Sequence, residues 1–393
     1  MTGTNILCVS HYYDVQGGGI ERVARQLASE LASSGLSVSW AATGKVSRQE
    51  QVQTIPLAAC DFSARIGLPF PIPYPSAVVR LARAIRQCDV VIIHDGMYLT
   101  SVAAMLLAKF TGRPAILVQH VGEIPMTSPV LTTIMKVVDR CVTRPMLRLA
   151  HRIVFISETS ARHFVTTRLN QPPVTIFNGV DTQIFRPSSS EQLSRTELGL
   201  PSGKPVALFV GRFVEKKGVL RLRALAERRP DIHWAFAGQG PIDPNGWGLQ
   251  NVSKHCGLSG EPLANLYRAS DLLVLPSTSE GFPLVVQEAL ACGLRIACCD
   301  DAARADTAAA PFLEGIDVDI ADEEGTLIRA ERAVLAALAA PDTADVRETR
   351  ARFAADRYSW RAAGQHYSVI VQALCGSKQT RAQTHRNRLW FGS

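Results

Sequence analysis

Residues 271–300, "DLLVLPSTSEGFPLVVQEALACGLRIACCD", contain the pattern that predicts the fold. The run "DLLVLPS" (271–277) is continuously apolar and ends in Pro and Ser, which is typical of a strand buried on both faces. A loop follows, Pro283 suits the first turn of a helix, and "LRIACCD" (294–300) repeats the strand pattern. A strand, a loop, a helix and a second strand predict a β-α-β unit of a parallel sheet.

The same alternation fills two stretches of the chain. Further strands are expected at 5–10, 36–42, 89–95, 115–120, 152–157, 205–211 and 232–238. Helical periodicity between them is clearest in the apolar positions from Ile20 to Leu31. The segment 186–205 is rich in Ser, Pro and Gly and is predicted to be a linker. The sequence therefore predicts an α/β protein with two Rossmann-like lobes.

Composition indicates a globular protein with ample core, since 47% of its 393 residues are hydrophobic and 20% are charged. No apolar run reaches the roughly 18 residues that span a bilayer, and the apolar run at the N-terminus is too short for a signal peptide. The nine cysteines include no C-x-x-C pair, so we expect a reducing cytoplasm. The net charge is +7, with the basic surplus in residues 1–186 and 376–393, which suggests an anionic partner. No nucleic-acid-binding motif accompanies it.

Four features could carry chemistry. Glu280 and Glu288 are eight residues apart, too far to share a proton if both were helical. Arg212 and Lys217, in "GRFVEKKG" (211–218), follow a predicted strand and could bind an anion such as diphosphate; a solvated charged turn is an equal alternative. His120 ends a strand, where a structural role is the commoner one. A glycine loop leads into the first helix, and alone it is a weak signal: Gly17, Gly18 and Gly19.

Taken together, these motifs resemble those of the GT4 glycosyltransferases, which are retaining enzymes of the GT-B fold. The stretch "PSTSEGFPLVVQEALACG" (276–293) resembles their E-x7-E signature, and "FVGRFVEKKGV" (209–219) resembles their donor loop. The segment "VTIFNGVDTQIFRP" (174–187) is similar to the one before their interdomain crossing. The resemblance covers residues 5–300 and "YSWRAAGQHYSVI" (358–370).

The resemblance implies a division of the chain and a role for each part. It implies an acceptor-side domain at 1–186, a donor-binding domain at 187–355, a helix crossing back at 356–375 and a mobile basic tail at 376–393. Two parallel sheets would face an interdomain cleft. The expected catalytic residues are His120, Arg212, Lys217 and Glu280. The expected donor-binding residues are Gly17, Gly18, Gly19, Gly211, Gly238, Gly281, Phe282 and Glu288.

The implied reaction moves a sugar from a nucleotide-sugar donor to a glycan or lipid-linked acceptor. The resemblance implies metal-independent chemistry without a cofactor, although the bare pair Asp300 and Asp301 stays open. Arg295 stands where the family usually has proline, and alanines replace common glycines in the next loop. A nucleotide-sugar epimerase or a non-catalytic nucleotide-sugar-binding protein on the same fold are the alternatives.

Basic residues recur every four positions between 136 and 152, with Pro145 expected to break or kink that helix. They are Lys136, Arg140, Arg144, Arg148 and Arg152. One interpretation is a surface that rests on an anionic membrane, and the other is a solvated helix face. We therefore expect a cytoplasmic enzyme, with a peripheral position at the inner face of the membrane as the open alternative.

Overall fold

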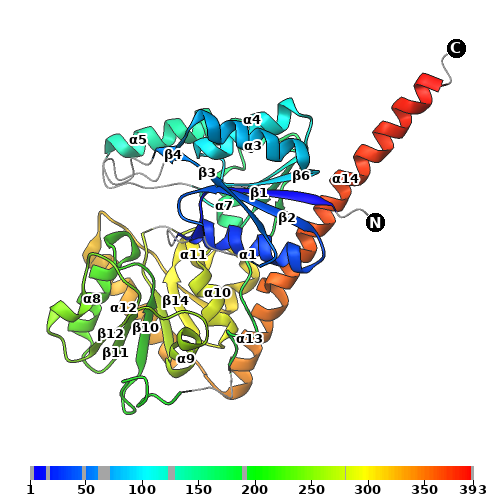
Figure 1. Ribbon diagram of the computed structural model, residues 1–393. Helices are drawn as coiled ribbons and strands as arrows, with labels where there is room; N and C mark the ends of the chain where they lie inside the picture. Colours follow the sequence, from blue (N-terminus) through cyan, green and yellow to red (C-terminus); the bar gives the residue numbers. More distant parts are fainter. Residues whose placement is uncertain are drawn as a thin grey trace. The chain divides into compact units, whose positions relative to one another are not determined.

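The computed structural model describes residues 4–14, 18–46, 50–60, 71–122, 129–187, 193–278 and 280–390, with side chains up to Gly376 except that of Pro129. The chain forms two compact units (Figure 1). Unit 1 comprises Met1–Ile156, Ser160–Gly179 and Trp360–Ser393, and unit 2 comprises Ser157–Thr159 and Val180–Ser359. Gly17 lies outside the described residues.

Unit 1 is built on a parallel sheet whose strand order is β3-β2-β1-β6-β7-β8-β9. Its strands are β1 (Asn5–Tyr12), β2 (Ser37–Thr43), β3 (Gln53–Leu57), β6 (Val90–His94), β7 (Ala115–Gln119), β8 (Arg152–Phe155) and β9 (Val174–Thr175). A small antiparallel pair is formed by β4 (Ala59–Cys60) and β5 (Ile72–Pro73). The chain runs outward from β1 in one direction and from β6 in the other, so these neighbours mark a switch in topology.

Helices bury both faces of this sheet, because successive side chains of each strand point to opposite sides. The helices are α1 (Gly19–Ser33), α3 (Pro75–Gln87), α4 (Leu99–Phe110), α5 (Pro129–Val138), α6 (Arg144–Leu149), α7 (Glu158–His163) and α14 (Trp360–Trp390). Ile6 and Cys8 share one core cluster with residues of α1 and α14, whereas Leu7 and Val9 share the other with residues of α3 and α4. The helix near the end of the chain thus belongs to the core of its beginning.

One helical run in unit 1 is irregular. Between α5 and α6, residues Asp139–Thr143 form a π-helical turn, directly before Pro145 in the first turn of α6. Proline has no N–H to donate and clashes with the carbonyl one turn before it, and widening the preceding turn accommodates both defects. The predicted break at Pro145 therefore takes the form of a π turn, and Arg144 leaves the solvated face to pair with Asp139.

Unit 2 repeats the plan with a parallel sheet in the order β12-β11-β10-β13-β14-β15. Its strands are β10 (Val206–Val210), β11 (His233–Ala237), β12 (Val252–His255), β13 (Leu272–Leu275), β14 (Arg295–Cys299) and β15 (Leu313–Ile316). Its α-helices are α8 (Val219–Arg228), α9 (Glu261–Ala269), α10 (Leu284–Ala291), α11 (Asp300–Ala303), α12 (Glu323–Ala339) and α13 (Ala344–Tyr358), and its 3-10 turns are Glu215–Lys217, Pro244–Trp247 and Thr307–Phe312. The switch here lies between β10 and β13.

These two parallel-sheet α/β units confirm the predicted fold class, and every predicted strand is present within a residue or two. The boundaries differ. Unit 1 ends at Gly179, and the predicted linker is held to unit 2, because Arg195 donates to Ala269 O at 2.8 Å and to Asp271 Oδ2 at 2.6 Å. The chain rejoins unit 1 at Trp360, and α14 continues to Trp390 where no regular element was predicted.

Candidate functional site

The predicted cations and the first glutamate meet at the switch point of unit 2, where parallel sheets bind ligands at the carboxyl ends of their strands. Arg212 follows β10, and Glu280 follows β13. The side chain of Lys217, in the 3-10 turn after β10, forms a short ion pair with Glu280 Oε1. Residues 63 positions apart are thus joined, with side chains that remain 24% and 12% exposed.

Lys216 adds a third cation that the sequence analysis did not single out. Loss of hydration lowers the pKa of Lys216, Glu280 opposes this, and the positive charges of Lys217 and Arg212 lower it further. Arg212 is exposed and has no carboxylate partner among the residues that the structure describes. The charges that act on Lys216 are therefore two further cations and the carboxylate of Glu280, an excess of positive charge that suits an anionic ligand.

Two glycines let the loops of unit 2 approach one another closely. Gly218 has a φ of 74°, and a Cβ there would lie 2.2 Å from Pro276 O, in the segment that leads to Glu280. Gly238, at the end of β11, has a φ of 142°, and a Cβ there would lie 1.9 Å from Gly211 O. Side chains at these positions would push the ends of the strands apart. Gly211 and Gly238 thus have a structural role, whatever they contact in a complex.

The second glutamate lies apart from the ion pair. Glu288 is buried in α10, and its Oε2 accepts a hydrogen bond of 2.9 Å from the hydroxyl of Tyr267. Pro283 precedes α10 as its N-cap, one position earlier than predicted. Phe282 is buried and packs edge-on against Tyr358, with ring centres 5.3 Å apart. Gly281 lies half-buried between Glu280 and Phe282.

Arg295, the predicted departure from the family pattern, has a structural role. It begins β14, at the end of the strand opposite to the switch point. Its guanidinium donates to Asp271 O at 3.1 Å, Leu338 O at 2.8 Å and Ala340 O at 3.0 Å. These bonds tie the strand to the end of α12, so this substitution does not reach the candidate site within unit 2.

The switch point of unit 1 contains a buried polar cluster of which the sequence analysis named only His120. His11 is the penultimate residue of β1, His94 ends β6 and His120 follows β7. His94 Nδ1 and His120 Nε2 lie 3.1 Å apart. Burial lowers the pKa of His94 to about 3 and holds the pKa of His120 well below its usual range, so both imidazoles are neutral at pH 7. The N–H of one ring therefore donates a neutral hydrogen bond to the nitrogen of the other.

Asp95 is the most unusual member of this cluster. It is fully buried, and among the described residues it is the non-glycine with a positive φ, 64°. Its Oδ1 accepts from Gln119 Nε2 at 3.2 Å and from Met97 N at 3.3 Å, whereas Oδ2 has no hydrogen-bond partner. Burial raises the pKa of Asp95 to about 6, against lowering by these bonds and by His11. Strained, unsatisfied groups of this kind are typical of functional sites.

The glycine loop before α1 makes room for another member of this polar cluster. Glu21, in the first turn of α1, is buried and pairs with His11 at 2.9 Å. A Cβ on Gly18 would lie 1.8 Å from Glu21 Oε2, so Gly18 makes room for this carboxylate. Gly19 begins the helix with open space around it. His11 also stacks on Tyr98, with ring centres 3.6 Å apart.

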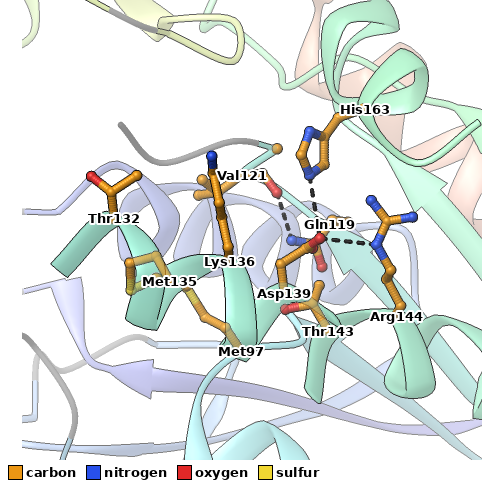
Figure 2. Close-up of a pocket in the computed structure, with 11 residues that line it drawn as sticks. Met97, Gln119, Val121, Thr132, Met135, Lys136, Asp139, Thr143, Arg144 and His163 are labelled. Carbon is orange, nitrogen blue, oxygen red and sulfur yellow. Dashed lines mark hydrogen bonds and ion pairs between the residues drawn. The ribbon is translucent and has the colours of Figure 1, made fainter. Parts of the chain in front are cut away.

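A pocket of about 220 Å³ lies beside this cluster in unit 1 (Figure 2). Met97, Val121 and Met135 supply apolar walls. Gln119 reaches it as well, and donates to Val121 O at 2.7 Å. The remaining wall is polar and comes from α5, the π turn and the helices that follow: Thr132, Lys136, Asp139, Thr143, Arg144 and His163.

For the polar residues of unit 1 that were not predicted, the sequence contained one usable signal. "DVVIIHD" (89–95) is an apolar strand that closes on a His-Asp pair, and polar residues at the end of a buried strand mark the ligand-binding edge of a sheet. No sequence signal marked Glu21 or the pocket, because their positions depend on tertiary packing. Within the described ranges, no group of three or more His, Cys, Asp or Glu side chains could hold a metal ion, and no helix is long and apolar enough to cross a membrane.

Comparison with protein families gives matches over most of the chain. A family model described as Glycosyltransferase Family 4 matches residues 17–184, and one described as Glycosyl transferases group 1 matches residues 190–315. A D-inositol 3-phosphate glycosyltransferase of Arthrobacter sp. (strain FB24) is 27% identical over 318 residues, which is 70% of this chain and 72% of that protein. Its namesake from Thermobispora bispora is 36% identical over 171 residues, 38% of this chain and 40% of that protein.

Solved structures share the fold at low identity. A sucrose-phosphate synthase from Thermosynechococcus elongatus matches with a TM-score of 0.73 and 18% identity, over 95% of this chain and all of that one. HepE of Anabaena, solved with UDP and glucose, matches with a TM-score of 0.69 and 16% identity, over 94% of this chain and all of that one. WaaG, a glycosyltransferase involved in lipopolysaccharide biosynthesis, matches with a TM-score of 0.62 and 16% identity, over 93% and 99%.

Proposed function

The chain belongs to the glycosyltransferases that these two family models describe, with the GT-B fold, and from this premise we propose that it transfers a sugar with retention of anomeric configuration. The donor is a nucleotide sugar, and the acceptor is a glycan or a lipid-linked molecule of the cell envelope. The observation that carries the proposal is the ion pair of Lys217 with Glu280, beside Arg212, at the switch point of unit 2. HepE of Anabaena, which has a similar fold, was solved in complex with the nucleotide sugar UDP-glucose.

In this proposal the donor diphosphate binds to the cations of unit 2. When the bond between the sugar and phosphate breaks, its electron pair passes to the phosphate oxygen, and preoriented cations are worth most as that charge develops. Arg212 and Lys217 supply this stabilisation, with Lys216 adding to the field. Because side chains provide the positive charge, we propose that the reaction needs neither a metal nor a cofactor.

The glutamates would bind hydroxyl groups. Glu280 accepts hydrogen bonds from vicinal hydroxyls of the donor sugar, and Glu288 accepts those of the ribose, since a carboxylate accepts more strongly than a neutral oxygen. Lys217 and Tyr267 already orient these two carboxylates. Glycines 17–19, Gly211, Gly238 and Gly281 would allow the donor to approach the backbone, and Phe282 would hold the loop in place.

His120 would contribute a neutral hydrogen bond near the donor sugar. Its pKa lies well below the usual range, so it adds no charge to an oxocarbenium-like centre. The acceptor oxygen forms its bond to the anomeric carbon on the face that the phosphate leaves, and the acceptor's proton passes to the leaving phosphate oxygen. This internal return retains configuration without a covalent intermediate on the protein.

The test combines donor binding with product analysis. A nucleotide sugar that binds raises the melting temperature in a panel of UDP-, GDP- and ADP-sugars, because it binds the folded state only. Proton NMR of the reaction with that donor should then show transfer with the donor's anomeric configuration, unaffected by EDTA. If the donor is isomerised in the absence of an acceptor, the protein is an epimerase. If the donor binds but is not turned over, the protein is non-catalytic. Inversion of configuration, or loss of transfer in EDTA, would contradict the mechanism.

We also propose that the enzyme is cytoplasmic and docks on an anionic membrane through α5. Val130, Ile134 and Val137 are 68%, 45% and 54% exposed on this helix, and the neighbouring Arg140 is exposed as well. Apolar side chains beside cations suit the interface of an anionic bilayer. The five-residue basic band predicted from the sequence is not one solvated face, because Arg144 pairs with Asp139 and Arg152 begins β8.

Co-sedimentation with vesicles tests this docking. We expect binding to vesicles that contain phosphatidylglycerol, little binding to pure phosphatidylcholine, and weakening of several-fold by Val137→Asp, which places a charge in the apolar contact. Val79→Asp, at an exposed valine of α3, is the matched control and should have no effect. Equal binding by the two variants, or none at low salt, would remove the proposal.

A further inference from the structure

The pocket beside the polar cluster of unit 1 has an unusual local origin. It opens at the π turn Asp139–Thr143, and π turns inside helical runs are frequent at functional sites because they redirect the side chains that they contain. Here Asp139 and Thr143 line the pocket together with Arg144, which follows the turn. A regular helix would distribute these three side chains differently, so the turn before Pro145 builds this wall.

Among the described residues that line the pocket, positive side chains outnumber negative ones. Asp139 Oδ2 pairs with Arg144 Nε at 2.9 Å and lies 3.6 Å from His163 Nε2, as the dashed lines of Figure 2 mark. Arg144 also donates to Thr167 Oγ1 at 2.8 Å, which fixes its position. Lys136 lines the same pocket, and no carboxylate pairs with it in the part of the chain that the structure describes. The one acid among the described lining residues is therefore engaged, and the ammonium of Lys136 is left to attract an anion.

The pocket is connected to the candidate reaction centre through unit 1 itself. Gln119 lines the pocket and precedes His120 in the chain, and its amide nitrogen donates both to Asp95 Oδ1 and to Val121 O. Met97, another lining residue, donates its backbone N–H to the same Asp95 oxygen. The wall of the pocket is thus joined to the His94–His120 pair through Gln119, the residue before His120.

We propose that this pocket binds a phosphate group of the acceptor, with Lys136 as its charged ligand and His163 and Thr143 as neighbouring donors. The inference rests on the proposed glycosyl transfer, whose acceptor it narrows to a phosphorylated molecule. Met97 and Met135 would pack on the apolar part of that molecule, and its hydroxyl would extend toward His120. The phosphate can belong to a soluble ester or to a lipid headgroup.

Calorimetric titration of the full chain distinguishes these sources. The probes are sn-glycerol 3-phosphate and vesicles that contain phosphatidic acid, which present the same phosphate monoester in soluble and lipid form. We expect Lys136→Met to weaken binding of the preferred probe about tenfold, the loss expected for one charge-assisted hydrogen bond. Lys136→Arg should restore most of the affinity. Lys109→Met is the matched control, since this exposed lysine of α4 lies outside the pocket, and it should change little.

Binding of the nucleotide sugar, whose proposed contacts include none of the three substituted side chains, should be the same in all three variants. Phosphate binding that is absent, or that Lys136→Met and Lys109→Met weaken equally, overturns the inference even if sugar transfer is observed. Phosphate binding that depends on Lys136 in a chain without transferase activity would instead leave the pocket intact and overturn the proposed function. The two failures are therefore distinguishable.

Discussion

At the scale of single residues, the buried carboxylate of Asp95 should destabilise the folded protein when it is charged. Its folded pKa of about 6 lies above the ordinary 3.8, so folding favours the protonated carboxyl. That stabilisation is present at low pH and is lost as the pH rises through about 6, at a cost on the order of 3 kcal/mol. His11 reduces this cost, because it lowers the pKa of Asp95. Burial, together with Asp95 and Glu21, raises the pKa of the neighbouring Tyr98 hydroxyl.

Asp95→Asn should therefore stabilise the protein at pH 7.5 by about 1–3 kcal/mol, because the amide is uncharged and asparagine tolerates a positive φ. Urea denaturation at pH 4.5 and 7.5 measures the effect, which should be largest at the higher pH. Asp89→Asn is the control, since that side chain is 43% exposed. A variant that is less stable than the wild type at pH 7.5 would contradict this view of the carboxylate.

Lys217 and Arg212 should act mainly on turnover. Removing either charge takes away stabilisation that is largest in the transition state, so Lys217→Met and Arg212→Met should each lower kcat by about 10²–10³-fold. Steady-state kinetics with the preferred donor measure this. Arg223→Met, an exposed arginine on α8 whose partner is Glu227, is the control. An unchanged kcat in both variants would remove these residues from the catalytic site.

At the scale of elements, the sequence identified the buried strands and failed at the edges. The central strands β1, β6, β10 and β13 are continuously apolar, and their periodicity was sufficient. The edge strands β3, β12 and β15 are half-exposed, so no continuous apolar run marked them. The π turn was foreseen only as a break, because proline shows where a helix is disturbed and not how the backbone adapts.

The tie between β14 and α12 gives a prediction at this scale. Arg295→Met would leave three carbonyl oxygens without their donor, and we expect a loss of about 2–4 kcal/mol in the free energy of unfolding of unit 2. Thermal or urea denaturation measures this loss. Arg304→Met, whose side chain is 71% exposed, should change stability by less than about 0.5 kcal/mol. Equal effects of the two substitutions would refute the structural role.

At the scale of the whole molecule, unit 1 is completed by the end of the chain. Ala363, Tyr367 and Val371 of α14 are buried in the same core cluster as Ala24, Leu27 and Leu31 of α1. Tyr367→Ala should therefore lower the stability of unit 1 by about 3–5 kcal/mol and leave donor binding to unit 2 in place. Hydrogen exchange resolved by peptide should show faster exchange in β1 and α1 but not in β10; uniform loss of protection in both units would contradict this.

The sequence predicted one of the two polar sites far better than the other. In unit 2 the site residues lie within two short motifs, so local patterns and the family resemblance located Arg212, Lys217 and Glu280. In unit 1 the polar cluster gathers single residues from the ends of β1, β6 and β7 and from α1. Only the order of strands in the sheet brings these together, and a linear pattern does not contain that order.

The most direct test is the affinity of the preferred nucleotide sugar, measured by calorimetry in the wild type and in the double variant Arg212→Met/Lys217→Met. We predict a loss of about 100-fold, because each of the two cations proposed to bind the diphosphate should contribute about tenfold to donor affinity beside its larger effect on kcat, and no change in Lys136→Met, whose pocket belongs to unit 1. Undiminished donor affinity in the double variant would contradict the assignment of the switch point of unit 2 as the donor site.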